Sequence, residues 1–391
     1  MKILGIETSC DETSLAIIEA ENGIFEVRTN IVSSQSKIHA KYGGVVPEVA
    51  ARQHAENFMG VLDMALRKAR VKEQDIDLIA CVCGPGLVTS LLVGSAAAKT
   101  FAFVLKKPLV PVNHMKGHIY ANFLTPPLGL SCKKWEQDPK LFLLSKNSPT
   151  TRSMGRLGEV LFPALCLVVS GGHTELVLMR GIERFKKIGE TLDDAAGECF
   201  DKVAKMLDLP YPGGPQISQH SKAGNPHAYH FPRPMLDQEN YNFSFAGLKT
   251  SVLYFLRDHK ISTSPSLDEL KSKVLEKGGK KILADVCASV EQAIVDTLIG
   301  KSLRALKEYH VKTIMLAGGV AANQRLRQQM EQRLRDQFPE VVFMKPALQF
   351  CTDNAAMAAV AGYFQYLTSK NKKTFLRAWK SMKVDPNMDI A

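Results

Sequence analysis

Short apolar runs alternate along this chain with longer stretches in which apolar residues recur at helical spacing. The first two runs, Ile3–Ile6 and Leu15–Ile18, flank a polar segment rich in hydroxyl and carboxylate side chains. A similar pair of runs within residues 165–179 flanks the segment Ser-Gly-Gly-His-Thr at 170–174. Short apolar runs bounded by turn residues predict β-strands, so each pair predicts a β-hairpin whose polar turn can wrap phosphate or magnesium.

Helical patterns follow the predicted hairpins. Apolar residues in 47–70 recur every three to four positions behind a proline suited to a first helical turn. Residues 87–105 form the longest apolar stretch, which also contains glycine, serine and lysine, so we expect a buried helix and no membrane span. Residues 313–317 predict a strand, and the double glycine and helix behind it are typical of a backbone that approaches an adenosine or a phosphate.

The repeated hairpin, one in each half of the chain, predicts a duplicated α/β fold. This is the arrangement of the actin, Hsp70 and sugar-kinase superfamily, in which two RNase H-like lobes enclose a cleft for nucleotide and metal. We place the N-terminal lobe at residues 1–125, a basic insertion at 126–160 and the C-terminal lobe at 161–349. Residues 350–391, where Thr352 is expected to cap a helix, are expected to pack back on the N-terminal lobe.

Composition and charge narrow the class of protein. Of the 391 residues, 45% are hydrophobic and 23% charged, which is typical of soluble globular proteins. The net charge of +11 favours a polyanionic partner, nucleic acid among them. Eight cysteines without a Cys-x-x-Cys pair favour reduced, buried thiols. Because a strand is predicted from Ile3 onward, we expect no signal peptide. We therefore expect a cytoplasmic protein, or a mitochondrial matrix protein whose transit peptide was removed.

The clearest candidate chemistry is a pair of histidines four residues apart, His114 and His118. On a helix both imidazoles face one side and can reach one metal ion, although a lone pair at this spacing is more often structural. A zinc protease of the His-Glu-x-x-His type needs a glutamate base directly after the first histidine. Met115 occupies that position, and neither Lys116 nor Gly117 can replace the base. The pair therefore indicates a metal that positions a substrate and does not split water.

Two other motifs are expected to be structural. Asp193 and Asp194 are expected only to begin the helix predicted over residues 195–207, whose N-terminus favours carboxylates. Phe243 and Phe245 are expected to pack in the core and not to stack on bases. The Lys- and Arg-rich residues 132–156 of the insertion are expected either to contact a nucleic acid or to be a solvated surface loop.

Several motifs occur together in the order found in one family. They are Ile6-Glu7-Thr8-Ser9-Cys10-Asp11-Glu12-Thr13, Gly43-Gly44-Val45-Val46-Pro47-Glu48, Gly84-Pro85-Gly86-Leu87, His114-Met115-Lys116-Gly117-His118, Val169-Ser170-Gly171-Gly172-His173-Thr174, Tyr211-Pro212-Gly213-Gly214-Pro215, Ala317-Gly318-Gly319-Val320 and Cys351-Thr352-Asp353-Asn354. On these motifs the chain resembles the tRNA adenosine threonylcarbamoyltransferase family, in its bacterial and organellar branch. The resemblance covers nearly the whole chain apart from the basic insertion and the C-terminal end.

The resemblance implies transfer of threonylcarbamoyl from threonylcarbamoyl-AMP to N6 of adenosine 37 in tRNAs that read ANN codons, with release of AMP. It implies one divalent metal, Fe²⁺ before Zn²⁺, held by His114, His118 and Asp353. The positions that match the substrate-binding residues are Val168, Val169, Ser170, Gly171, Gly172, Asp201, Gly214 and Asn323. Asp11 and Glu12 match an acidic pair from which one carboxylate could take the amine proton, and ATP with Mg²⁺ could occupy the same cleft.

The resemblance also implies partners. A separate enzyme would make threonylcarbamoyl-AMP, and the chain would act with a smaller paralogous subunit and an ATPase, as bacterial members do, or as a homodimer, as organellar members do. Three other classes stay open. A small-molecule kinase of the same superfamily would consume ATP and phosphorylate an acceptor. A metalloprotease is opposed by Met115, and a scaffold of the actin or Hsp70 kind does not need three metal-ligand candidates.

Overall fold

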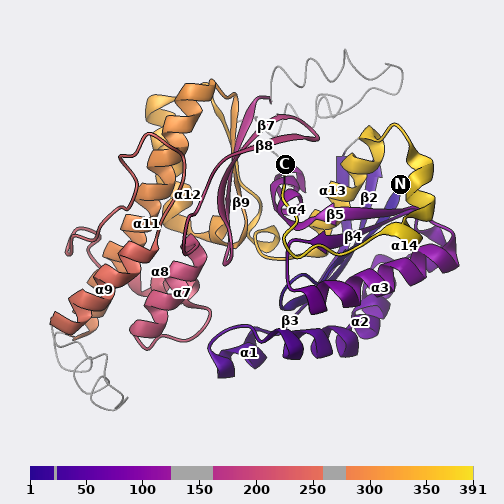
Figure 1. Ribbon diagram of the computed structural model, residues 1–391, viewed down its shortest axis with the longest axis horizontal. Helices are drawn as coiled ribbons and strands as arrows, with labels where there is room; N and C mark the ends of the chain where they lie inside the picture. The colour runs from indigo at the N-terminus through magenta and orange to yellow at the C-terminus, as the bar shows by residue number, and fades with distance from the viewer. Residues whose placement is uncertain (22–23, 125–161, 259–278, 391) are drawn as a thin grey trace.

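The computed structural model describes residues 1–21, 24–124, 162–258 and 279–390, and its two lobes each contain a five-stranded sheet (Figure 1). The strands are β1 (Lys2–Glu7), β2 (Glu12–Glu21), β3 (Ile24–Ser34), β4 (Leu78–Gly84), β5 (Leu109–Asn113), β6 (Ala164–Val169), β7 (Thr174–Gly181), β8 (Arg184–Glu190), β9 (Thr313–Ala317) and β10 (Val342–Met344). The sheet orders are β3-β2-β1-β4-β5 and β8-β7-β6-β9-β10.

The two sheets are built on one plan. In each sheet three antiparallel strands are followed by two parallel strands: β1 pairs antiparallel with β2 and parallel with β4, and β6 pairs antiparallel with β7 and parallel with β9. The first strand of each sheet is therefore central and buried on both faces, which explains its continuous apolar run. The predicted duplicated α/β fold is confirmed.

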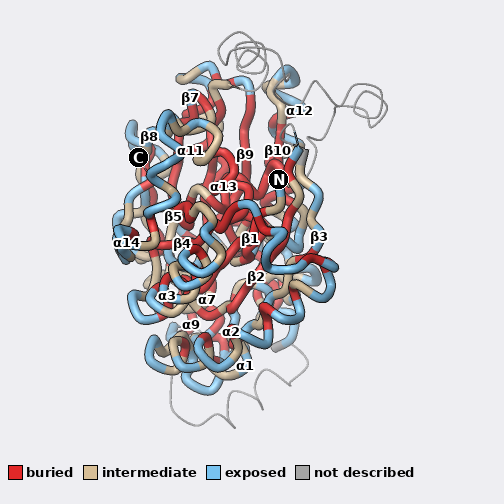
Figure 2. Tube along the Cα trace, turned by 90° about the vertical axis from the view of Figure 1, so that its right-hand side faces the viewer, coloured by how far each residue is buried: buried red, intermediate tan, exposed pale blue. Residues whose placement is uncertain are grey.

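Three helices cover the N-terminal sheet. The predicted helix over 47–70 is α2 (Pro47–Ala69), which packs against β2 and β3, and α3 (Val88–Leu105) packs against β4. The alanine-rich α13 (Ala355–Thr368) packs against β1, β2 and β4. Figure 2 shows that the strands and α13 are buried while the outer helices expose one side.

The expectation of a buried helix at 87–105 is only partly right. α3 is helical, but 33% of its residues are buried, because its outward side is also apolar. Its exposed large apolar residues are Val88, Leu92, Phe103 and Val104. Among the described residues, α3 alone is long and apolar enough to cross a membrane, and a single helix of this kind is weak evidence for a span.

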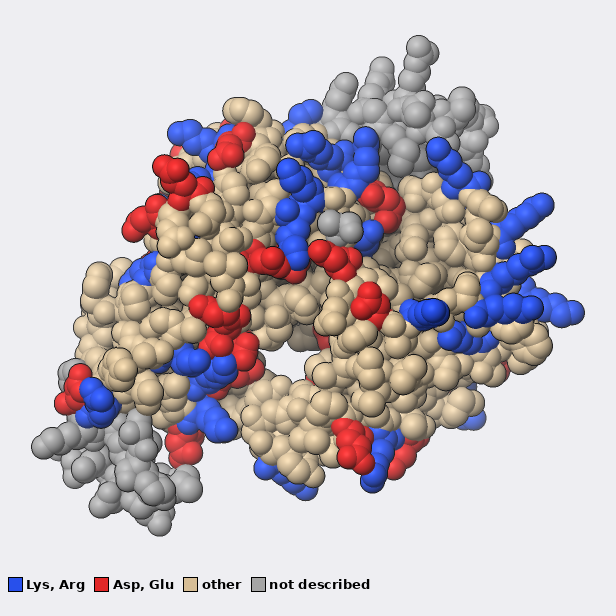
Figure 3. Space-filling model, viewed as in Figure 1, with Lys and Arg blue, Asp and Glu red and all other residues tan. Residues whose placement is uncertain are grey.

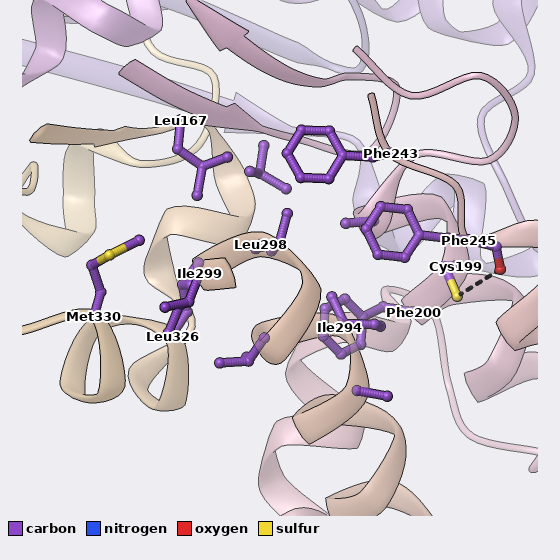
Figure 4. Close-up of a cluster of buried hydrophobic side chains, with 14 of the residues drawn as sticks. Leu167, Cys199, Phe200, Phe243, Phe245, Ile294, Leu298, Ile299, Leu326 and Met330 are labelled. Carbon is purple, nitrogen blue, oxygen red and sulfur yellow. Dashed lines mark hydrogen bonds between the residues drawn. The ribbon is translucent and has the colours of Figure 1, made fainter. Parts of the chain in front are cut away.

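The C-terminal lobe is built around the long helix α11 (Gly279–Tyr309), which packs on β6 and on α8 (Gly213–Ser221). The other helices are α7 (Ala196–Met206), α9 (Ala246–Asp258) and α12 (Gln324–Gln337). Figure 4 shows Phe243 and Phe245 in this core with Leu298 of α11. Both phenylalanine rings are fully buried and stacked at 6.3 Å, so the expectation that they are core residues is confirmed.

Two predicted helix starts are wrong in detail. Thr352 is exposed and does not cap α13. The side chain of Asn354 accepts the Met357 N–H instead, so Asp353 lies before the helix and not in its first turn.

Asp193 does not begin the helix predicted at 195–207. Its side chain accepts the N–H groups of Phe245 and Ala246 at the start of α9. In both cases a competing side chain or a distant backbone segment supplied the better hydrogen bond.

The end of the described chain lies along the N-terminal lobe. The short helices η7 (Lys372–Arg377) and α14 (Ala378–Ser381) follow α13, and α14 packs on α3, where the rings of Phe103 and Trp379 are 4.6 Å apart. The following residues, 382–390, run past β4 and β5, where the Asp385 N–H donates to the Cys83 carbonyl oxygen at 2.8 Å. The basic insertion predicted at 126–160 lies outside the described residues.

Gly5→Ala is expected to lower the free energy of unfolding by about 1–3 kcal/mol, because a Cβ would collide with the Ala355 carbonyl oxygen and lie 3.1 Å from the Ala359 Cβ. Gly60→Ala is the matched control, since this glycine is exposed within α2 with no atom within 4 Å of an added Cβ. There the change should stabilise by about 0.4–1 kcal/mol. Urea unfolding measures both, and equal effects would contradict the close approach of β1 and α13.

Candidate active site

The two histidines lie on a short helix at the edge of the N-terminal sheet. β5 ends at Asn113, and α4 (His114–Tyr120) begins at once. The Asn113 side-chain oxygen accepts the Lys116 N–H at 3.1 Å and so caps the helix. This places His114 and His118 one turn apart on the same side of α4, with the side chain of His118 fully buried.

The third candidate ligand comes from the far end of the chain. Asp353 precedes α13, and its Oδ1 lies 3.5 Å from His114 Nε2 and 3.1 Å from His118 Nε2. The two Nε2 atoms are 3.1 Å apart. Ligand atoms at about 2.0–2.1 Å from a tetrahedral metal lie roughly 3.3 Å from one another, so this triangle fits a metal ion. Within the described residues, His114, His118 and Asp353 are the group of side chains of metal-binding type that lie close enough together to hold a metal ion.

A second carboxylate orients the first histidine. His114 Nδ1 lies 2.9 Å from Glu7 Oε2 and 3.1 Å from Ser9 Oγ, and Glu7 is completely buried at the end of β1. The Glu7 carboxylate accepts a hydrogen bond from Nδ1, so Nε2 is the ring nitrogen that faces His118 and Asp353 and that would bind a metal after losing its proton. The sequence analysis missed this role of Glu7. A carboxylate that directly follows a buried apolar strand was the available signal.

Charge pairing sets the protonation of the triangle. Burial lowers the pKa of His114, but the carboxylates of Asp353 and Glu7 outweigh it and raise that pKa to about 9. Burial raises the pKa of Asp353, and the two histidines outweigh it and lower the pKa to about 2. Burial and the neighbouring His114 and His118 lower the pKa of His173 to about 4. A cation bound by the triangle would have to displace the proton from His114.

The acidic pair lies in the turn between β1 and β2. Burial, followed by the charges of Asp353 and Asp11, raises the pKa of Glu12 to about 10, and Glu12 Oε1 accepts the Ser34 hydroxyl at 3.1 Å. A carboxyl group with this pKa is protonated near neutral pH. Glu12 is therefore a poor candidate for a base.

A buried histidine, which the sequence analysis did not single out, holds this acidic turn. His54 of α2 is fully buried, with Nδ1 2.8 Å from Thr13 Oγ1 and Nε2 3.0 Å from the Cys10 carbonyl oxygen. Its two ring nitrogens thus bond to the residues on either side of Asp11 and Glu12. The position of the acidic pair is fixed by α2 as well as by the hairpin.

The corresponding loop of the C-terminal lobe begins at the buried end of β6. Val168 and Val169 are buried as whole residues, whereas Gly171 and Gly172 of the following turn are exposed. Ser170 closes the turn, because its Oγ accepts the His173 N–H at 3.1 Å. Gly171 and Gly172 have no atom within 4 Å of an added Cβ, which leaves open space beside them.

The remaining candidate residues lie deeper in the C-terminal lobe and are bonded within the protein. Asp201 Oδ1 accepts the Gly213 N–H at 2.7 Å at the start of α8, next to Gly214. Burial raises the pKa of Asp201, against the opposing hydrogen bonds from the backbone of Gly213 and Gly214. These contacts order the first turn of α8.

Asn323 is fully engaged by protein partners. Its Oδ1 caps α12, and its Nδ2 donates to Glu291 Oε1 at 2.7 Å and to Ser218 Oγ at 3.0 Å. Glu291 is buried in α11 and also accepts Ser221 Oγ at 2.6 Å, which ties α8, α11 and α12 together. The sequence analysis did not find Glu291, because it lies in the middle of a long helix without a motif.

The structure thus brings some of the predicted site residues together and places others in a different part of the protein. His114, His118 and Asp353 form a single triangle, and the charge of Asp353 acts on Glu12. Asp201 and Asn323 contact α8 within the C-terminal lobe instead. Figure 3 shows the molecule hollowed between the two lobes. A ligand that contacts both groups would have to lie across this hollow.

Comparison with known proteins identifies the family. The family model described as "TsaD: tRNA N6-adenosine threonylcarbamoyltransferase" matches residues 26–134 and 151–360. A protein of that name from Kosmotoga olearia is 44% identical over 93% of this chain and 93% of its own length. One from Thermomicrobium roseum is 45% identical over 93% of this chain and 92% of its own.

A solved structure of T. kodakarensis HypF matches 94% of this chain and 48% of the HypF chain, with a TM-score of 0.54 and 13% sequence identity. This similarity shows the fold alone. The family model and the curated relatives, by contrast, cover most of the sequence. This chain therefore belongs to the tRNA N6-adenosine threonylcarbamoyltransferase family.

Proposed function

We propose that this protein transfers the threonylcarbamoyl group from threonylcarbamoyl-AMP to N6 of adenosine 37 in tRNAs that read ANN codons, and releases AMP. The observation that carries the proposal is the triangle of His114, His118 and Asp353 between two lobes that match this family over most of the chain. The protease alternative is disfavoured, because Met115 is buried and cannot serve as a base. A kinase shares the fold but does not account for the three ligands.

The reaction joins a weak electrophile to a weak nucleophile. Nitrogen lone pairs reduce the reactivity of both the carbamoyl carbon and the adenine amine. A divalent metal held by the triangle would supply a Lewis acid for the acyl or phosphate oxygen. The lobes would hold the adenylate and the base in register, which can contribute several kcal/mol. Asp11 would accept the amine proton, and Glu12, with its raised pKa, would donate a hydrogen bond.

We propose Fe²⁺ or Zn²⁺ as the metal, since two imidazoles and a carboxylate suit both. Wild-type protein should bind about one equivalent, while His118→Ala and Asp353→Asn should each lose most of it. A matched control is the double variant His227→Ala and Asp336→Asn, which removes the same two groups at exposed positions. Elemental analysis after anaerobic reconstitution measures the content. Full metal content in both ligand variants would refute the site.

Metal affinity should rise with pH below about 9. The pKa of His114 in the metal-free protein is about 9, so at lower pH a metal must displace a proton. One displaced proton changes the apparent affinity about tenfold per pH unit. Competition with a chromophoric chelator at about pH 6.5, 7.5 and 8.5 measures this slope. An affinity that is independent of pH would contradict the pairing of His114 with Glu7 and Asp353.

The activity is tested with purified protein, threonylcarbamoyl-AMP and an unmodified ANN-decoding tRNA, read by nucleoside mass spectrometry. Wild type should form the modified adenosine, Asp353→Asn should lose it, and Asp11→Asn should be slower by about 10²–10⁴-fold. Glu12→Gln should be milder, because it keeps a hydrogen-bond donor. Absence of product with wild type, with and without bacterial partner subunits, would sink the proposal. ATP-dependent phosphorylation of an acceptor would favour the kinase.

We also propose that the protein acts with a second protein subunit, either another copy of this chain or a smaller paralogue. The exposed apolar side of α3 supports this, because apolar patches on a surface helix are typical of interfaces. An upstream enzyme that makes threonylcarbamoyl-AMP and, in the multi-subunit case, an ATPase complete the proposed set. Light scattering of the purified chain separates a 43.1 kDa monomer from a homodimer.

A further inference from the structure

We propose that the C-terminal segment 370–383 is a docking surface for the phosphate backbone of the tRNA. The inference rests on the proposed function, since it takes tRNA as the substrate. The segment contains six basic residues and no Asp or Glu. They are Lys370, Lys372, Lys373, Arg377, Lys380 and Lys383, and all are exposed.

The cations of this segment differ from those on the other surface helices. Elsewhere exposed cations are often neutralised one turn away, as in the pairs Arg52–Glu48 at 2.7 Å and Arg67–Asp63 at 2.8 Å on α2. None of the six basic residues of segment 370–383 forms an ion pair with another described residue. Like charges on neighbouring side chains repel one another, so the cluster is unfavourable until an anion lies on it.

The second half of the segment is packed on the N-terminal lobe. Ala378 and Met382 are buried, and Trp379 packs on Phe103 of α3. Lys380 also lies 5.1 Å from the Trp379 ring centroid. Because the backbone under the charges is packed, less conformational entropy is lost when a ligand binds than on a disordered tail.

The residues that follow the segment contact the start of α4, the helix that carries His114 and His118. The Asn113 side chain, which caps α4, donates to the Met388 carbonyl oxygen at 3.4 Å and to the Asp389 carbonyl oxygen at 3.0 Å. Met388 is five positions after Lys383, and such a length of chain spans at most about 18 Å. Lys383 is thus the end of the segment nearest to α4 along the chain, and a tRNA whose target base enters the cleft would meet the segment from this end.

The surface charge on one face of the protein agrees with this placement. Figure 3 shows Lys and Arg side chains gathered at the right-hand edge, where Figure 1 places α14. Nucleic-acid binding draws most of its affinity from phosphate neutralisation, and a clustered basic surface in a chain of net charge +11 is its electrostatic footprint. An anionic membrane would meet the same charges, but the link to α4 favours the substrate of the site.

The test is charge reversal on the segment. Lys372→Glu with Lys373→Glu is compared with Lys307→Glu with Arg333→Glu, which makes the same change in net charge at exposed positions of the C-terminal lobe. Fluorescence anisotropy measures the affinity for an unmodified ANN-decoding tRNA from about 0.05 to 0.2 M salt. We expect the segment variant to bind at least about tenfold more weakly, with a salt slope smaller by roughly 1.5–2.

Kinetics distinguish docking from catalysis. In the segment variant the KM for tRNA should rise by about the same factor as its Kd, while the KM for threonylcarbamoyl-AMP stays at the wild-type value. Lys372→Ala with Lys373→Ala should show a smaller shift in the same direction. Thermal unfolding of each variant verifies that the fold is kept.

Three results would overturn the inference while leaving the proposed function intact. The first is that the segment variant binds tRNA with wild-type affinity. The second is that the control variant, Lys307→Glu with Arg333→Glu, weakens tRNA binding by the same factor. The third is that phosphatidylserine vesicles bind wild type and not the segment variant while tRNA binding is unaffected. If wild-type protein neither binds nor modifies the tRNA, the proposed function fails first and this inference with it.

Discussion

The candidate site depends on the close packing of α13 against the N-terminal sheet and α4. Gly5 of β1 leaves room for the backbone of Ala355, and Gly362 within α13 leaves room for Ala80 of β4. Gly117 of α4 lies against the side chain of Met357 in α13. Small residues on both sides let two backbones approach, and this approach brings Asp353 from the end of the chain to His114 and His118 at its middle. The triangle of these three side chains is thus a consequence of backbone packing.

The second constraint is the cost of burying charge. An isolated buried carboxylate or imidazolium is strongly unfavourable, so each must have a partner. His114 lies between Glu7 and Asp353, and Glu291 accepts hydrogen bonds from Ser221 and Asn323. Each of these pairs joins two secondary-structure elements, so the partners that offset the burial also fix the geometry of the cleft. These contacts hold the side chains in place without a bound ligand.

Sequence reasoning succeeded where the signal was local. The apolar runs and glycine-rich turns predicted the hairpins, and His114 and His118 were placed on one face of a helix from their spacing alone. It failed where two local candidates competed. Thr352 and Asn354 are both good caps, and Asn354 caps α13. α3 showed that an apolar helix need not be buried, since composition does not reveal which side meets the sheet.

The sequence by itself determined the strand and helix pattern, the duplication and the pair His114 and His118 on one face of a helix, because hydrophobic period, turn residues and helix spacing act over a few residues. Only the tertiary structure decided that Glu7 orients His114, that His54 holds the acidic turn, and that Asn323 is occupied by Glu291. These contacts join residues far apart in the chain. They depend on how whole elements pack, which no short stretch of sequence contains.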